Sequence, residues 1–231
     1  MSCLVKEIKY KNNIDRLKKD IAETCLKTGV NPDEIMLIAA SKYANAEQIE
    51  QVSRFGIDDF GENRADELID KFRIIGNKVH WHFIGHLQSR KAKLVVPIVD
   101  YIHSIDRLST LEKVDSEAFK NNKIQNVLLE INISGEETKF GMKPEELALF
   151  LNEAVRFKNV KVKGLMTMAP FTGDVFAIRN VFRSLNELLK YANRNFKGIN
   201  LKELSMGMSN DFKIALEEGA TMLRIGSLIF L

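Results

Sequence analysis

The stretch Ile35-Met-Leu-Ile-Ala-Ala-Ser-Lys42 decides the fold of this 231-residue chain. Apolar residues follow one another here behind a Pro-Asp-Glu turn, and the β-branched members among them predict a short strand buried on both faces. Such a strand is typical of a parallel sheet that is covered by helices. The run ends in a lysine, and the carboxyl end of a buried strand is where α/β proteins place their chemistry.

Lys42 has two interpretations. Lysine is costly to bury without a partner, so we expect partial desolvation to lower the pKa of Lys42 and free its lone pair for attack on an aldehyde or ketone. The alternative is that the side chain only extends out of the sheet into solvent. The stretch taken by itself favours this alternative, and the rest of the chain shifts the balance.

The composition indicates one soluble globular domain over residues 1–231. Hydrophobic residues make up 45% of the chain and charged residues 28%, and the net charge of +3 is too small to indicate nucleic acid or another polyanion as partner. No apolar run approaches the ~20 residues of a membrane span, and the charged amino terminus is not a secretory signal. We therefore expect a cytoplasmic protein in which Cys3 and Cys25 are reduced thiols.

Predicted strands and helices alternate along the whole chain. An amphipathic helix over 4–28 comes first, with Leu4, Ile8, Ile14, Leu17, Ile21 and Leu26 at helical spacing. The predicted strands cover 35–42, 57–60, 80–84, 99–103, 126–133, 160–166, 201–205 and 221–225. The predicted helices between them cover 46–55, 64–75, 88–96, 107–120, 144–157, 174–194 and 211–218. Eight such units indicate an α/β fold, a (β/α)8 TIM barrel with an extra N-terminal helix, and an open doubly wound sheet is the alternative.

Polar groups should meet where the barrel strands end, because all carboxyl ends share one face. The loops 207–210 and 226–227 follow the last two predicted strands. Their small residues let backbone amides approach an anion, and Ser209 or Asn210 is expected to cap the helix that follows. The alternative is that they only turn the chain. Arg224 needs an acceptor, either a carboxylate of the protein or a bound group.

Other kinds of site have less support. His80, His82 and His86 could suggest a metal, but no acid or thiol cluster accompanies them, so we expect none. The chain has no nucleophile elbow, no Gly-rich dinucleotide motif and no phosphate-binding lysine loop. The basic run 90–93 is typical of a solvated helix face.

The motifs in their order resemble one family. They are Ala40-Ser-Lys42, Phe60-Gly-Glu-Asn63, His80-Trp-His-Phe-Ile-Gly85 with Leu87-Gln88, Ser104-Ile-Asp-Arg107, Gly164-Leu-Met166, Gly207-Met-Ser209 and Arg224-Ile-Gly226. The chain is similar from about residue 37 onward to the pyridoxal phosphate homeostasis proteins, which are relatives of the alanine racemase barrel domain. It departs from their pattern at Ser89-Arg90, where asparagine is usual, and at Ser227-Leu-Ile-Phe-Leu231, where a longer helix is usual.

The resemblance implies a cofactor and a role for each candidate residue. Pyridoxal 5′-phosphate (PLP) would be held as a Schiff base on Lys42. The cofactor-binding residues that it implies are Lys42, Asn63, Met166, Ser209, Arg224, Gly226 and Ser227, with Ser209 and the 226–227 amides at the phosphate, Arg224 at the pyridine nitrogen, and Asn63 and Met166 around the ring. A cation at that nitrogen disfavours pyridinium formation and weakens the ring as an electron sink.

The family implies a monomeric carrier or buffer of PLP that passes the cofactor to apo-enzymes, with no catalytic residues. Racemase-like enzymes add a further domain, which this chain has no room for beside the barrel. A weak PLP-dependent racemase or lyase is the alternative, and a cofactor-free lysine aldolase is a third hypothesis. An absorbance spectrum with and without borohydride separates them.

Overall fold

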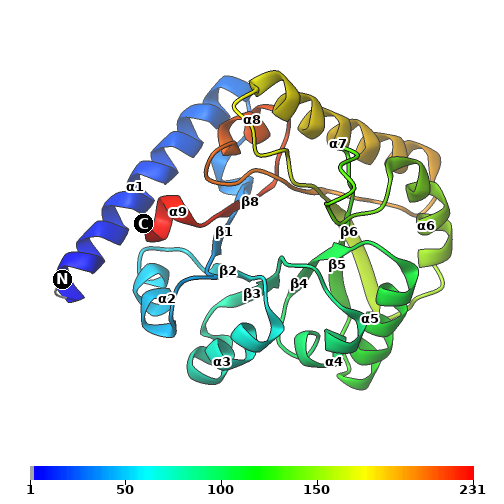
Figure 1. Ribbon diagram of the computed structural model, residues 1–231, viewed down its shortest axis with the longest axis horizontal. Coiled ribbons are helices and arrows are strands. Elements are labelled where there is room, and N and C mark those ends of the chain that lie inside the picture. Colours follow the sequence, from blue (N-terminus) through cyan, green and yellow to red (C-terminus); the bar gives the residue numbers. More distant parts are fainter. Residues whose placement is uncertain (1–2) are drawn as a thin grey trace.

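The fold is a closed barrel of parallel strands, as predicted (Figure 1). The computed structural model describes residues 3–231, with side chains from residue 7 onward. The strands are β1 Met36–Ala40, β2 Asp59–Glu62, β3 His80–Phe83, β4 Tyr101–Ile105, β5 Gln125–Glu130, β6 Val160–Met166, β7 Glu203–Ser205 and β8 Met222–Ile225. Each pairs in parallel with the next, and β8 pairs with β1 to close the ring. The alternative of an open sheet is therefore wrong.

Helices connect the strands on the outside of the barrel. They are α1 Cys3–Thr28, α2 Ala46–Ser53, α3 Ala65–Ile75, α4 Ala92–Val95, α5 Leu108–Lys120, α6 Leu147–Ala154, α7 Val175–Asn195, α8 Phe212–Glu217 and α9 Ser227–Phe230. Short 3-10 turns are η1 Pro32–Glu34, η2 Gly76–Lys78, η3 Ser89–Lys91 and η4 Pro144–Glu146. Within the described residues, no helix is long and apolar enough to span a bilayer.

The extra helix α1 packs beside the end of the chain, next to α9 (Figure 1). Its buried face is made by Tyr10, Ile14, Leu17, Ile21 and Cys25. Ile8 and Leu26 are exposed, so the predicted face was wrong by about one position at each end. The Asn13 amide donates to the backbone oxygen of Ile229 at 3.0 Å. Cys25 is a free, buried thiol, whereas the side chains of Cys3 and Leu4 lie outside the described part.

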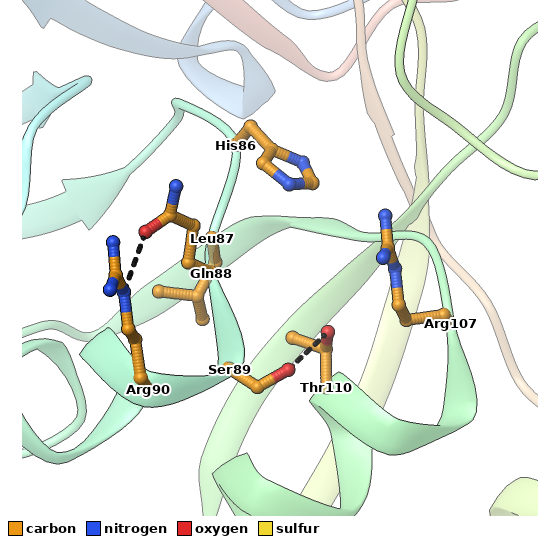
Figure 2. Close-up of a pocket in the computed structure, with 7 residues that line it drawn as sticks. All are labelled: His86, Leu87, Gln88, Ser89, Arg90, Arg107 and Thr110. Carbon is orange, nitrogen blue, oxygen red and sulfur yellow. Dashed lines mark hydrogen bonds between the residues drawn. The ribbon is translucent and has the colours of Figure 1, made fainter.

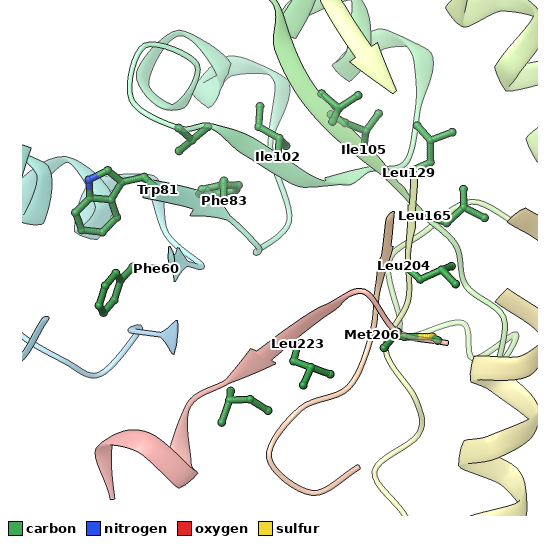
Figure 3. Close-up of a cluster of buried hydrophobic side chains, with 14 of the residues drawn as sticks. Phe60, Trp81, Phe83, Ile102, Ile105, Leu129, Leu165, Leu204, Met206 and Leu223 are labelled. Atoms are coloured by element: carbon green, nitrogen blue, oxygen red, sulfur yellow. The ribbon is translucent and has the colours of Figure 1, made fainter. Parts of the chain in front are cut away.

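Two apolar layers hold the barrel together. The larger lies between strands and helices and includes Phe60, Trp81, Phe83, Ile102, Leu129, Leu165 and Leu223 (Figure 3). The smaller lies inside the barrel and consists of Ile38, Leu128, Met166 and Met222. Because side chains alternate along a strand, the inward positions beyond these residues project toward the carboxyl-terminal mouth of the barrel.

Candidate functional site

Lys42 lies in the turn that leaves the barrel mouth. Strand β1 ends at Ala40, two residues earlier than predicted, and the Lys42 side chain is exposed. The expectation that burial desolvates Lys42 is therefore wrong. Its ammonium lies 4.8 Å from the centroid of the Tyr43 ring. A cation–π contact at an exposed site contributes about 0.5–1 kcal/mol, so the side chain is held weakly and can swing.

The residue before Lys42 is fixed firmly. The Ser41 hydroxyl donates to Glu62 Oε1 at 2.5 Å, and the Lys71 ammonium contacts the same oxygen at 2.6 Å and the Ser41 carbonyl at 2.8 Å. Glu62 is fully buried. Burial raises the pKa of the Glu62 carboxyl, against the opposing effects of Lys71 and Ser41. A buried ion pair therefore fixes the backbone from which a mobile lysine projects.

The loops after β7 and β8 lie beside the end of β1. A Cβ on Gly226 would lie 3.2 Å from the carbonyl oxygen of Ala40. Ser209 Oγ accepts from the Leu228 amide at 3.4 Å, and the Arg224 amide donates to the Gly207 oxygen at 3.0 Å. The two predicted phosphate loops are thus neighbours of each other and of the Lys42 turn. Ser227 is the first residue of helix α9.

The predicted cap of the helix after β7 is wrong. The N-cap of α8 is Asp211, not Ser209 or Asn210, and the Asp211 carboxylate accepts from the Met208 amide at 2.5 Å. A carboxylate thus closes the loop onto itself. This leaves the Ser209 hydroxyl at the boundary with the loop after β8.

Arg224 is buried at the bottom of the mouth. Its guanidinium donates to Ser205 Oγ at 2.5 Å and to the Thr167 carbonyl at 3.0 Å. Burial lowers the pKa of Arg224 to about 10, although Glu130 and Asp211 oppose the shift as nearby charges. The sequence predicted that either a protein carboxylate or a bound group would accept from Arg224. Neither of these two contacts is a carboxylate, and a hydroxyl and a carbonyl of the protein hold the arginine instead.

Glu130 is a site residue that the sequence interpretation did not single out. It ends β5, is 3% exposed, and its Oε2 makes no hydrogen bond within the described part of the chain. It shares the inward parity of Leu128 in the barrel interior. Burial raises the pKa of Glu130 to about 7, with Asp106 adding to the rise and Arg224 opposing it. The only sequence signal was a carboxylate inside an otherwise apolar strand.

Asn63 and Met166 occupy different depths. Asn63 follows β2 at the mouth, where its carbonyl would lie 2.2 Å from a Cβ on Gly85. Met166 ends β6 but is 1% exposed and belongs to the apolar cluster inside the barrel. Asn63 is thus at the rim, and Met166 is part of the floor beneath it.

A basic pocket of about 390 Å³ lies on the β3–β4 side (Figure 2). It is lined by residues 86–90 and by Arg107 and Thr110. Its cations already have partners: Arg107 makes two contacts with Asp106, at 3.0 and 3.1 Å, and Arg90 donates to Gln88 at 3.1 Å. Lys42 lines a separate pocket of about 470 Å³. The amine of interest is therefore not in the basic pocket.

The three histidines are dispersed. His80 is exposed on the outside, His82 points into the barrel, and His86 stacks on Phe140 with ring centroids 3.8 Å apart. Among the described residues, no group of His, Cys, Asp and Glu has the arrangement of a metal site.

Comparison with known proteins gives matches over nearly the whole chain. Residues 13–231 match the family described as alanine racemase, N-terminal domain. The pyridoxal phosphate homeostasis protein of Aquifex aeolicus is 40% identical, over 94% of this chain and 95% of that protein. PipY of Synechococcus elongatus, in a structure with PLP bound, has a TM-score of 0.81 at 31% identity, covering 91% of this chain and all of that one.

Alanine racemase of Clostridium difficile shares the fold alone. Its TM-score is 0.73 at 14% identity, and the match covers 96% of this chain but 56% of the racemase. The similarity of fold therefore extends to a longer chain, of which the match covers 56%, whereas the similarity of sequence is to proteins matched over nearly their whole length. This chain belongs to the pyridoxal phosphate homeostasis protein family, which has the barrel of the alanine racemase N-terminal domain.

Proposed function

We propose that this protein binds PLP as a Schiff base on Lys42 and carries it in the cytoplasm. One observation carries the proposal: the Lys42 turn, the Ser209 loop and the Gly226 loop adjoin one another, with a buried arginine beneath. An aldehyde that also bears a phosphate needs an amine and an anion-binding loop within one molecular length. The named cofactor of the PLP-bound PipY structure has both groups.

Each residue has a role that follows from its position. Lys42 is exposed and weakly held, so its amine can add to the aldehyde and release water, provided that a proton leaves the ammonium first. Ser209, Gly226 and Ser227 would hold the phosphate. The buried Arg224 guanidinium would face the pyridine nitrogen, where its permanent charge opposes ring protonation. Asn63 at the rim and Met166 in the floor would bound the ring.

The fit is supported by donors that the protein does not use up. Arg224 has five N–H donors, and its two terminal nitrogens each donate one hydrogen bond to the protein. Within the described residues, the contact of the Lys42 ammonium is with the face of the Tyr43 ring. A carrier needs this reversible holding and no further acid or base. PLP, when bound, would supply an electron-withdrawing ring on the lysine nitrogen.

An absorbance spectrum tests the proposal. Purified protein mixed with PLP should show the band of a Schiff base, and borohydride should convert it to a stable adduct that mass spectrometry locates on Lys42. Lys42→Ala should show neither, whereas Lys91→Ala, a change to another lysine of the same face of the barrel, should behave as wild type. An adduct on a different lysine would refute the assignment.

Transfer and oligomeric state belong to the same proposal. A monomeric carrier should elute as one chain and should activate an apo-enzyme that depends on PLP faster than free PLP does at equal concentration. If the protein and free PLP activated the apo-enzyme at equal rates, transfer of the cofactor would be rejected, and the protein would only store PLP.

A weak racemase is the second candidate, because Glu130 offers an ionisable carboxyl at the mouth. It would be favoured if deuterium from solvent entered the Cα position of an added amino acid and if this exchange were lost in Glu130→Gln. No exchange above that of free PLP would reject it.

A further inference from the structure

Five polar side chains form one continuous line through the barrel interior. Arg224 Nη1 contacts Ser205 Oγ at 2.5 Å, and Ser205 Oγ contacts His103 Nδ1 at 2.9 Å. His103 Nε2 contacts His82 Nδ1 at 3.0 Å, and His82 Nε2 contacts Asp59 Oδ1 at 2.9 Å. We call this line, from Arg224 to Asp59, the buried relay. Its members come from five different strands, so only the closed barrel brings them together.

The relay is almost completely dry and spans the barrel. Ser205 and His103 are fully buried, His82 is 1% exposed and Arg224 4%. Asp59 is the first residue of β2, and its side chain is 20% exposed. The line therefore leads from the floor of the mouth toward the opposite rim. Buried polar networks stabilise a structure when their members have partners, and Ser205, His103 and His82 each have a partner on both sides.

The chemistry of arginine gives the relay a direction. A guanidinium can only donate, so Ser205 Oγ accepts from Arg224 and its single hydrogen goes to His103 Nδ1. Burial holds the pKa of His103 well below its usual value, with His82 and Arg224 adding to the effect, so the ring is neutral. Its one N–H is then at Nε2 and donates to His82 Nδ1. His82 in turn donates from Nε2 to the Asp59 carboxylate.

The opposite direction leaves a group unsatisfied. If His82 donated from Nδ1, His103 would have to donate from Nδ1 to Ser205. The hydroxyl would then accept two hydrogen bonds, while its own hydrogen would have no acceptor among the described residues. An unmade hydrogen bond in a dry interior is destabilising. The direction that begins at Arg224 and ends at a carboxylate gives the donors of Ser205, His103 and His82 an acceptor each.

We propose that Ser205, His103, His82 and Asp59 are positioning residues, which hold the Arg224 guanidinium as a donor aimed at the ring of the cofactor. This inference rests on the proposed function. The Thr167 carbonyl fixes one terminal nitrogen of the guanidinium and the relay fixes the other. Two anchors define the plane of the group, so the remaining donors face the ligand in one orientation. The Asp59 carboxylate at the far end can only accept, as is required if each hydrogen bond of the relay is donated in the direction from Arg224 toward Asp59.

Histidine tautomers test the relay without the cofactor. In protein with ¹⁵N-labelled histidine, at neutral pH and with or without PLP, long-range ¹H–¹⁵N correlations should show His82 and His103 both protonated at Nε2 alone. His80 cannot serve as the reference, because its Nδ1 lies 3.5 Å from the same Asp59 oxygen, so free histidine in the same buffer is used instead. Protonation of His103 at Nδ1 would overturn the proposal. Because this readout needs no PLP, it survives a failure of the proposed function, which absence of PLP binding by the wild type would reveal.

Substitutions of His82 test its effect on the ligand. His82→Phe breaks the relay and should raise the Kd of PLP about tenfold and shift the absorbance maximum of bound PLP. His82→Gln keeps one acceptor and one donor, so it should bind within about threefold of wild type. A His82→Gln protein as weak as His82→Phe would show that keeping a donor and an acceptor does not preserve binding, and it would overturn the proposal.

Two further proteins complete the test. Tyr101 stacks on His82 with ring centroids 5.3 Å apart but contributes no link to the relay, so Tyr101→Phe should bind PLP as wild type does. Asp59→Asn combined with His82→Phe should be no weaker than His82→Phe alone, because both changes interrupt the same line. Multiplied losses in the double variant, or an equal loss in Tyr101→Phe, would overturn the proposal.

Discussion

Glu130→Gln should remove a pH dependence from the stability of the cofactor-free protein. The carboxyl is 3% exposed, and burial raises its pKa from the usual 4.5 to about 7. The folded protein therefore binds this proton more tightly than the unfolded chain does. The contribution of Glu130 to stability is fully present below pH 4.5 and is lost as the pH rises through 7.

The size of the effect follows from the shift. A rise from 4.5 to about 7 corresponds to about 3 kcal/mol, since one pKa unit is about 1.4 kcal/mol. Roughly 2.5 kcal/mol of this falls between pH 5 and pH 8. Urea unfolding followed by circular dichroism at these two pH values measures it. The wild type should lose this much more free energy of unfolding than Glu130→Gln does over the same interval.

The comparison between pH values avoids the cost of the substitution itself, because the amide burial is the same at both. Glu112→Gln on the exposed side of α5 is the matched control and should keep the wild-type dependence. A Glu130→Gln protein whose two free energies differ as much as those of the wild type, within about 0.5 kcal/mol, would refute the reasoning. The carboxyl would then be hydrated rather than buried in the mouth.

Two further predictions concern the base of the site. Lys71→Met should lower the free energy of unfolding by about 3 kcal/mol, because it leaves the Glu62 carboxylate buried without its ion-pair partner. In a urea titration, adding Glu62→Gln to this variant should recover most of the lost free energy. No recovery in the double variant would contradict the prediction. Gly85→Ala should lower the free energy of unfolding by more than about 3 kcal/mol in the same titration, because its Cβ would lie 2.2 Å from the Asn63 carbonyl oxygen. Gly173→Ala has open space and should change the free energy of unfolding by under about 0.5 kcal/mol. Equal effects of the two substitutions would contradict the prediction.

The order of elements could be predicted because strands and helices differ in their hydrophobic period. Strand β6 has the predicted bounds, and α7 differs from its prediction by one residue at each end. Strand ends were less predictable: β1 stops at Ala40, since the chain turns away before Ser41. Because of that difference of two residues, Lys42 follows the exposed one of its two interpretations and not the partly desolvated one. The local pattern of apolar residues does not predict the residue at which a strand stops pairing with its neighbours.

The convergence of side chains across the barrel was beyond sequence reasoning. His82 and His103 stand 21 residues apart, and Ser205 lies 102 residues from His103. Their hydrogen bonds depend on the stagger of strands around the ring, which no single stretch specifies. Glu130 was missed for the same reason, because its importance arises from Arg224 on another strand. The residues that follow strands were predictable, and those that face one another inside the barrel were not.

The pairing of β1 with β8, which closes the barrel, has a consequence for folding during synthesis. Lys42 emerges early from the ribosome, but Arg224, Gly226 and Ser227 belong to the last elements of the barrel to be synthesised. Until β8 docks, β1 has an open edge, and the Lys42 turn lacks the neighbouring loop that we propose holds the phosphate. The ring-closing pairs are also the most distant in sequence and so the costliest in chain entropy. A half-made chain would therefore lack the proposed PLP site, which is completed only when β8 pairs with β1.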